Sequence, residues 1–247
     1  MLNGKIAIVT GGTRGIGFAI VKKFLANNAT VILCGSKKET ADKAVEAILS
    51  ENPNAKVAGI CPNLSDIKEV EKAFARVNEE YGKIDILVNN AGISQRESIY
   101  DYDAEDFKKI MDLNVTAVFN CAKAVAPIMR SQGGGVILNN SSMVSIYGQK
   151  SGCGYPTSKF AVNGLTKSLA RELARDKIRV NAVAPGVVDT DMVAALPNDM
   201  REKLIATLPL GRMATPEDIA NAFLFLAGDM ASYISGIVLS VDGLAVN

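Results

Sequence analysis

Three polar side chains have the chemistry and the spacing for proton transfer to an alcohol oxygen. Tyr155 and Lys159 are four residues apart, which places a phenol and an ammonium group on one face of a helix. Pro156 suits the first turn of such a helix. Ser142 follows the apolar run 136–138, so a serine at a strand end can face the tyrosine across a cleft. The pair alone is equally compatible with an ordinary helical contact, so the chemistry requires a dinucleotide site elsewhere in the chain.

These three residues indicate a division of roles. A free tyrosine titrates at a pH of about 10 and is therefore a poor base at neutral pH. A neighbouring ammonium group favours the phenolate, so we expect Lys159 to lower the pKa of Tyr155. The hydroxyl of Ser142 would hold the reacting oxygen while a hydride moves elsewhere.

A glycine-rich turn near the amino terminus predicts the dinucleotide site. The run 5–10 is rich in β-branched residues and is typical of a buried strand, and apolar residues recur at helical spacing after residue 17. Between these segments lie Gly11, Gly15 and Gly17, in the spacing G-x-x-x-G-x-G. Glycines let the backbone approach a pyrophosphate at the amino terminus of a helix. A tight turn without a ligand is the alternative interpretation.

The end of the second predicted strand bears on the choice of cofactor. An NAD site usually offers an acidic side chain to the ribose about twenty residues after the glycine turn. Here the sequence is Ser36-Lys37-Lys38, and no acid precedes Glu39. Together with Arg14, these lysines could meet a 2′-phosphate, so we expect NADP(H) to be favoured over NAD(H). Lys37 and Lys38 could instead begin a solvated helix.

Strand-like and helix-like segments alternate along the whole chain. After the two predicted strands, they cover 56–61, 67–81, 84–88, 104–130, 135–140, 155–176, 178–184 and 237–241, and Thr215-Pro216 marks one more helix start. This alternation predicts an α/β fold: a single domain, 1–247, with a Rossmann-type doubly wound parallel sheet and helices on both faces.

Only the segment at about 187–211 breaks this rhythm. A loop and helix with an apolar face beside the cleft would form a substrate lid. Simple packing onto the body of the domain is the alternative. The apolar residues concerned are Met192, Val193, Ala194, Leu196, Ile205 and Leu208.

Composition and charge narrow the classes of function. The chain has 48% hydrophobic residues and a net charge of +1. This composition and charge indicate neither a nucleic-acid partner nor a membrane partner. Histidine is absent, which excludes a Ser-His-Asp hydrolase and a His-ligated zinc, and we expect no metal site. The four cysteines are scattered without metal spacing, as free thiols of a cytoplasmic protein would be: Cys34, Cys61, Cys121 and Cys153.

Five sets of residues together resemble the short-chain dehydrogenase/reductase family over essentially the whole chain. They are the turn 10–17, the motif Asn89-Asn90-Ala91-Gly92, the tetrad Asn114, Ser142, Tyr155 and Lys159, the pair Pro185-Gly186, and Thr190. In the family, the tetrad is catalytic and the last two sets meet the nicotinamide carboxamide. Asn63 stands where the family often has an aspartate that contacts the adenine.

The resemblance implies an enzyme that interconverts a secondary alcohol and a ketone. Tyr155 would be the general acid in reduction and the base in oxidation, and Ser142 would orient the carbonyl. Lys159 would hold the nicotinamide ribose, and Asn114 would hold a water that links the lysine to solvent. The implied cofactor contacts are Gly11, Thr13, Arg14, Gly15, Ile16, Gly17, Ser36, Lys37, Lys38, Asn63, Leu64, Asn90, Ala91, Gly92, Tyr155, Lys159, Pro185, Gly186, Val188 and Thr190.

Two branches of the family compete. The chain is similar to bacterial 3-oxoacyl-acyl-carrier-protein reductases, and more similar to bacterial bile-acid hydroxysteroid dehydrogenases of the 3α type. Pro127 stands where the former usually present a basic residue, although their second contact, Arg171, is present. We therefore expect a small hydrophobic alcohol or ketone of the bile-acid type, flanked by Tyr147 and Gln149. A 3-oxoacyl thioester is the alternative, and a dinucleotide-binding regulator that has lost catalysis is a remote third.

The resemblance also implies a homotetramer. The helices predicted over 115–129 and 161–173 carry apolar residues on more than one face, as helices that pair with symmetry mates across two-fold interfaces would. Deep burial within one subunit is the alternative explanation.

Overall fold

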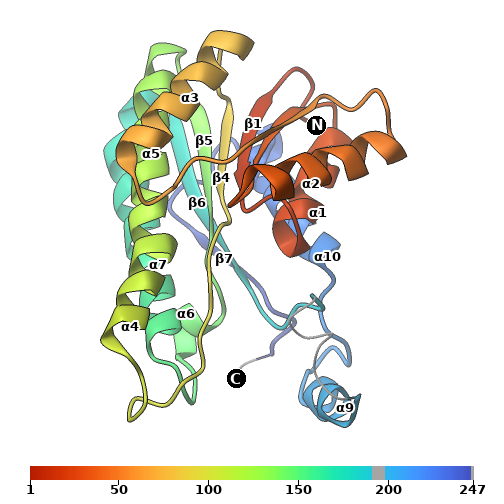
Figure 1. Cartoon of the computed structure of the whole chain (residues 1–247), viewed down its shortest axis with the longest axis vertical. Coiled ribbons are helices and arrows are strands. Elements are labelled where there is room, and N and C mark those ends of the chain that lie inside the picture. The colour runs from red at the N-terminus through yellow and green to blue at the C-terminus, as the bar shows by residue number, and fades with distance from the viewer. Residues whose placement is uncertain (191–197, 246–247) are drawn as a thin grey trace.

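The computed structural model describes residues 1–190 and 198–245, and a seven-stranded parallel sheet lies at its centre (Figure 1). The spatial order of the strands is β3-β2-β1-β4-β5-β6-β7. The strands are β1 (Ile6–Thr10), β2 (Thr30–Cys34), β3 (Val57–Ile60), β4 (Ile86–Asn89), β5 (Gly135–Asn140), β6 (Ile178–Pro185) and β7 (Val238–Val241). This confirms the predicted α/β fold with a doubly wound parallel sheet.

Helices cover both faces of this sheet, as the sequence predicts (Figure 1). In β1, Ala7 and Val9 face one hydrophobic core while Ile6 and Ile8 face the other, because successive side chains of a strand point to opposite faces. The first face carries α1 (Gly15–Leu25), α2 (Lys38–Glu51) and α10 (Pro216–Ala227). The second carries α3 (Ile67–Tyr81), α5 (Ala117–Ser131) and α7 (Gly154–Leu173).

A local signal places the start of α10 correctly. Thr215 caps α10, its side chain accepts from the backbone N–H of Asp218 at 3.1 Å, and Asp218 accepts in return from the backbone N–H of Thr215 at 2.8 Å. This reciprocal pairing satisfies two N–H groups that a helix start otherwise leaves without partners. The predicted helix start at Thr215-Pro216 is confirmed.

Two predicted elements differ from those observed. The strand predicted from residue 84 begins at Ile86, because the backbone of Ile84 is bound on both sides by the side chain of Gln132, at 3.1 and 2.8 Å. The helix predicted over 104–130 consists of α4 (Ala104–Met111), a π-helical turn (Asp112–Thr116) and α5.

The remaining short elements lie near the ends of the longer ones. They are α6 (Val144–Tyr147), α9 (Asn198–Ala206) and two 3₁₀ turns, Ala174–Asp176 and Asp229–Ala231. Within the described part of the chain, no helix is long and apolar enough to span a lipid bilayer.

The segment predicted as a lid lies partly outside the described residues, which include none of Met192, Val193, Ala194 and Leu196. The helix α9 stands apart from the sheet in Figure 1. Leu208 and Met213 form a small cluster there, against which Ile205 and Leu204 pack. Ile205 and Leu208 therefore pack within this segment, and its role as a lid stays a prediction.

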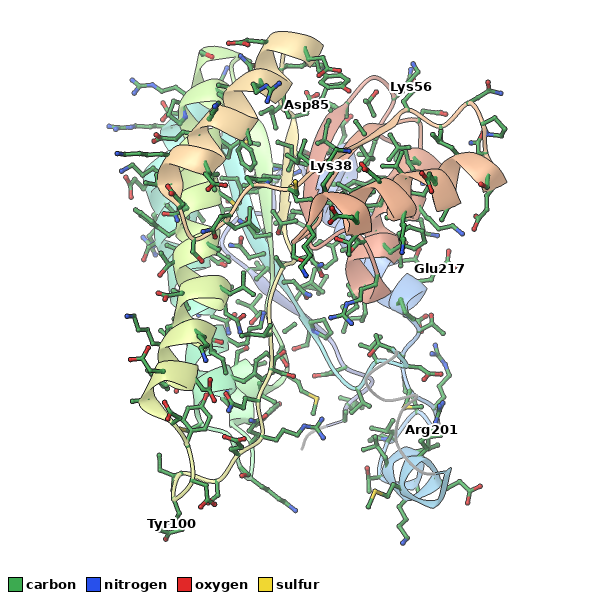
Figure 2. All side chains as sticks on the ribbon, in the orientation of Figure 1. Lys38, Lys56, Asp85, Tyr100, Arg201 and Glu217 are labelled. Carbon is green, nitrogen blue, oxygen red and sulfur yellow. The ribbon has the colours of Figure 1, made fainter. Side chains whose placement is uncertain are left out.

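The strand order reverses between β1 and β4, which start crossovers in opposite directions. A crevice at the carboxyl ends of the strands follows from this arrangement and is where ligands bind in open α/β sheets. Figure 2 shows this end of the molecule between Tyr100, in the loop after β4, and Arg201, on α9, with Asp85 at the opposite end.

Candidate active site

Two adjoining cavities lie at the carboxyl ends of the strands. The larger, of about 660 Å³, extends from the glycine turn to Ser36 and Asn63. The smaller, of about 300 Å³, surrounds Tyr155 and Lys159. Ile16, Asn90, Gly92, Ile93 and Thr190 line both, so a ligand in the larger cavity can reach the tyrosine.

The glycine-rich turn and the start of α1 require glycine at two positions. A Cβ at Gly17 would lie 2.1 Å from the carbonyl oxygen of Gly11, and Gly11 has a φ of +63° and would press a Cβ within 2.9 Å of the Cα of Ala91. The first turn of α1 contains no acidic residue and lines the larger cavity. A helix amino terminus free of carboxylates is suited to an anionic pyrophosphate, so these residues fit a dinucleotide.

Hydrogen bonds across three strands connect this turn to Lys159. The amide nitrogen of Asn90 donates to the carbonyl oxygens of Thr10 and Gly11, at 3.1 Å each. Asn140 donates to the side-chain oxygen of Asn90 at 2.9 Å. The ammonium group of Lys159 donates to the main-chain oxygen of Asn140 at 2.7 Å. The cofactor turn and the lysine are thereby held in one rigid array.

Burial dominates the electrostatics of Tyr155 and Lys159. The ammonium nitrogen of Lys159 lies 5.7 Å from the centre of the Tyr155 ring, and this lysine is only 4% exposed. Removal from water lowers the pKa of Lys159 to about 8. Burial likewise raises the pKa of Tyr155 above its ordinary value, while the hydrogen bond with Ser142 and the charge of Arg96 act to lower it.

Burial is the largest influence on the pKa of Tyr155 and raises it, and the groups that act to lower it are Ser142 and Arg96. The expected lowering of this pKa by Lys159 is therefore not seen among the influences that the protein alone supplies.

Asn114 lies in the π-helical turn and is fully buried. Its amide nitrogen donates to the main-chain oxygen of Ile93 at 2.8 Å and to the hydroxyl of Ser158 at 3.0 Å, and its oxygen accepts from the N–H of Ile93 at 2.9 Å. The side chain therefore ties the loop after β4 to α7. Whether Asn114 also holds a relay water stays a prediction.

The structure places most of the predicted cofactor contacts along the larger cavity. These are Gly11, Thr13, Arg14, Gly15, Ile16, Gly17, Ser36, Asn63, Leu64, Asn90, Ala91, Gly92 and Thr190. Pro185, Gly186 and Val188 line the smaller cavity together with Ser142, Tyr155 and Lys159.

Lys37 and Lys38 are not among the lining residues of either cavity. Lys38 forms an ion pair with Asp42 at 2.5 Å, one turn further along α2, and Lys37 is the residue that precedes this helix. Both lysines are exposed at the start of α2. This position agrees with the alternative interpretation, in which they begin a solvated helix.

Sequence reasoning missed several residues that line the cavities. Cys34, Cys61, Glu69 and Leu113 line the larger one, and Gln95, Arg96, Asn140 and Met143 the smaller one. The sequence gives little indication that these residues line a cavity, because most belong to loops or to strand ends without a motif. Gln149 lines the smaller cavity as expected, whereas Tyr147 does not. Among the described residues, no group of three metal-ligating side chains comes together.

Comparisons with known proteins extend over nearly the whole chain. A family model described as enoyl-(acyl carrier protein) reductase matches residues 11–243. The chain is 67% identical to a 3α-hydroxysteroid dehydrogenase of Mediterraneibacter gnavus, over 99% of this chain and 98% of that protein. It is 40% identical to a 3-oxoacyl-[acyl-carrier-protein] reductase of Thermotoga maritima, over 98% of each.

A solved structure has the same architecture. The chain superposes with a TM-score of 0.91 on a 7α-hydroxysteroid dehydrogenase complexed with NADH and 7-oxo glycochenodeoxycholic acid. The two are 34% identical, and the match covers 99% of this chain and 95% of that one.

We predict that Tyr155→Phe removes nearly all turnover and leaves cofactor affinity close to that of the wild type. General acid–base catalysis contributes about 10²–10⁴-fold, and among the described lining residues of the smaller cavity Tyr155 carries the only phenol. Steady-state rates and cofactor titration test this, with Tyr147→Phe as the control outside the cavity. A Tyr155→Phe variant within about threefold of wild-type activity contradicts the assignment. Lys159→Met should differ by weakening cofactor binding as well.

Proposed function

Because the chain belongs to the short-chain dehydrogenase/reductase family, we propose that it interconverts a secondary alcohol and a ketone on a bile-acid-type steroid. The observation that carries this proposal is the 67% identity to a 3α-hydroxysteroid dehydrogenase over nearly the full length of both chains. The chain is an oxidoreductase of this family, and a nicotinamide dinucleotide is its cofactor. The steroid and its reacting position are our inference.

The residues of the smaller cavity support this reaction. When bound, the dinucleotide supplies or accepts the hydride. The hydroxyls of Ser142 and Tyr155, which are hydrogen-bond partners, would both face the substrate oxygen. Tyr155 would give its proton to that oxygen in reduction and take it back in oxidation. Lys159 lies on the same face of α7 as Tyr155 and donates to the main-chain oxygen of Asn140. From this position it would meet the cofactor ribose.

Two alternatives have less support. A 3-oxoacyl thioester is the substrate named for a relative at 40% identity, well below the steroid enzyme at 67%. Pro127 lies within α5, where a basic residue for an acidic carrier protein was expected in that branch. An inactive regulator would have no reason to keep Ser142, Tyr155 and Lys159 around one cavity.

We further propose that NADP(H) is preferred over NAD(H). Ser36 and Arg14 line the larger cavity, and among the described lining residues the sole carboxylate is that of Glu69. That carboxylate accepts from the N–H of Asn63 at 2.8 Å. No acid is thus placed to repel a 2′-phosphate beside Ser36. Because Lys38 is bound to Asp42, Arg14 is the cation that this preference depends on.

We also propose a cytoplasmic homotetramer. A groove of about 690 Å³ between α5 and α7 has Pro127, Leu169 and Leu173 in its lining. Phe119, on its edge, is 47% exposed, and Phe160 on α7 is 50% exposed. Half-exposed aromatic rings on two neighbouring helices favour an interface with a second copy.

The substrate proposal predicts the outcome of a competition. A 3-oxo bile acid should exceed acetoacetyl thioester in kcat/KM by at least about tenfold, equivalent to about 1.4 kcal/mol of transition-state binding. Both substrates are offered to one enzyme preparation, and each product is quantified. A tenfold advantage of the thioester would establish the carrier-protein branch instead.

Ser36→Asp should move the cofactor preference toward NAD(H). A carboxylate at this position would repel a 2′-phosphate and accept from the ribose hydroxyl. The measurement is kcat/KM for both cofactors with one substrate, and Ser36→Asn is the uncharged control. If the wild type already prefers NAD(H), then Arg14 does not meet a 2′-phosphate and the NADP(H) proposal is wrong.

The homotetramer should be visible by light scattering at micromolar concentration. Phe119→Asp puts a charge at the edge of the groove and should shift the population to smaller species. Tyr233→Asp, on a fully exposed side chain that does not line the groove, should not. A monomeric wild type refutes this proposal.

A further inference from the structure

Three polar side chains beside Ser142 form a closed hydrogen-bonded network that has no role in the proposed function. Ser141 directly follows β5, Ser145 lies in α6 and Asn163 lies in α7. The hydroxyl of Ser141 donates to the side-chain oxygen of Asn163 at 2.6 Å, and the amide nitrogen of Asn163 donates to the hydroxyl of Ser145 at 2.8 Å. The two hydroxyls lie 3.1 Å apart. We call these three residues the Ser141–Ser145–Asn163 network.

The network ends on the backbone of Ser142. The hydroxyl of Ser145 donates to the main-chain oxygen of Ser142 at 2.5 Å, and the backbone N–H of Ser145 donates to the same oxygen at 2.9 Å. The N–H of Met143, in the same peptide unit, donates to the main-chain oxygen of Pro185 at 2.9 Å. The peptide unit after Ser142 is therefore held at both its oxygen and its nitrogen, which fixes the direction in which the Ser142 side chain leaves the backbone.

Asn163 lies on the same face of α7 as the phenol and the ammonium group. Tyr155, Lys159 and Asn163 follow one another at intervals of four residues within α7, and residues at this interval share one face of a helix. The helix that presents Tyr155 to the smaller cavity therefore also holds the segment that carries Ser142. The position of one hydroxyl relative to the other is thus set by a single rigid element.

Ser145 and Asn163 are not among the described lining residues of either cavity. They are therefore not placed to contact a ligand there, and an effect on the reaction must pass through another residue. Ser141 and Ser145 are each only 2% exposed. Buried hydroxyl and amide groups are costly unless they are paired, and a fully paired network specifies one geometry. A group that must orient a reacting oxygen requires such a fixed geometry.

We propose that Ser145 and Asn163 are positioning residues, which hold Ser142 at the place where its hydroxyl meets both Tyr155 and the substrate oxygen. The inference rests on the proposed alcohol–ketone chemistry, in which Ser142 orients that oxygen. Loss of either residue should slow the chemical step, because a displaced hydroxyl no longer meets the reacting group in the required geometry. Cofactor binding should stay intact, because neither residue lines the larger cavity.

The first test is a double-mutant cycle on kcat, measured with any alcohol that the wild type turns over. Ser145→Ala removes the hydroxyl that donates to Ser142 and should lower kcat about tenfold, while KM for the cofactor stays within about twofold of wild type. In a Ser142→Ala background, the same substitution should change kcat less than about twofold, because the side chain that it positions is gone. Asn163→Ala should give the same pattern.

Thr166→Val is the matched control on the same helix. Thr166 is fully buried, and its hydroxyl accepts from the amide nitrogen of Asn139 at 2.9 Å and donates to the main-chain oxygen of Val162 at 2.8 Å. This variant removes a buried side-chain bond between α7 and β5 without touching Ser142. It should lower the thermal stability, as the loss of a buried hydrogen bond does, and leave kcat close to that of the wild type.

A second readout needs no turnover. Amide hydrogen exchange of the segment 141–147 reports how firmly Ser142 is held, because the N–H groups of Ser141, Met143 and Ser145 are all hydrogen-bonded. Asn163→Ala should speed exchange in this segment and leave that of α3 unchanged. Thr166→Val should not change exchange in the segment. This measurement stays readable if the enzyme proves inactive on every steroid, so the two proposals fail separately.

Three results would overturn the proposal. The first is a Ser145→Ala substitution that lowers kcat by the same factor with and without Ser142, or that leaves kcat unchanged. The second is a Thr166→Val variant that loses as much kcat as Ser145→Ala, which would make a general loss of stability responsible. The third is hydrogen exchange of the segment 141–147 that is the same in Asn163→Ala and in the wild type.

Discussion

A chain of partly buried hydrogen bonds at the carboxyl edge of the sheet is the constraint on which the site depends. Thr10, Asn90 and Asn140 lie at the ends of three neighbouring strands, and each amide spans the gap to the next strand. Buried polar groups of this kind are costly unless they are paired. The pairing holds only if the strands end in register. The fold and the position of Lys159 are therefore specified together, and the glycine turn is fixed by the same bonds.

The burial that fixes this geometry also disfavours the charged forms of Tyr155 and Lys159, on which the chemistry depends. Lys159 is almost entirely enclosed, and the phenol beside it is removed from water as well. Both groups are consequently pushed toward their neutral forms. A site that must move a proton between a phenol and an alcohol thus needs compensation from groups that burial does not discharge. The hydrogen bond with Ser142 and the charge of Arg96 act in this direction on the pKa of Tyr155.

The sequence predicts features that depend on near neighbours and misses those that depend on distant ones. The helix Ile67–Tyr81 is predicted at both ends, because Asp66 caps it and Gly82 ends it in the left-handed conformation. The start of β4 is missed, since Gln132, 48 residues away, occupies the backbone of Ile84. Motif spacing locates the glycine turn and the tetrad. It does not reveal Arg96, whose place depends on Gly152, nor the sign of the Tyr155 pKa shift, which depends on burial.

The loop after β4 and the loop before α7 contact each other through Gln149 and Gly152. These contacts lie outside the hydrophobic core, so a change in substrate recognition need not change stability. Gly152 lets the two loops touch backbone to backbone, and none of Gln95, Arg96, Gln149 and Gly152 belongs to the hydrophobic clusters that hold the helices on the sheet. Side chains on these loops can be exchanged without opening a hole in the core. Such a chain is therefore well suited to acquire new substrates, by natural divergence or in a library of loop variants, provided that the glycine and the glutamine that join the two loops are retained.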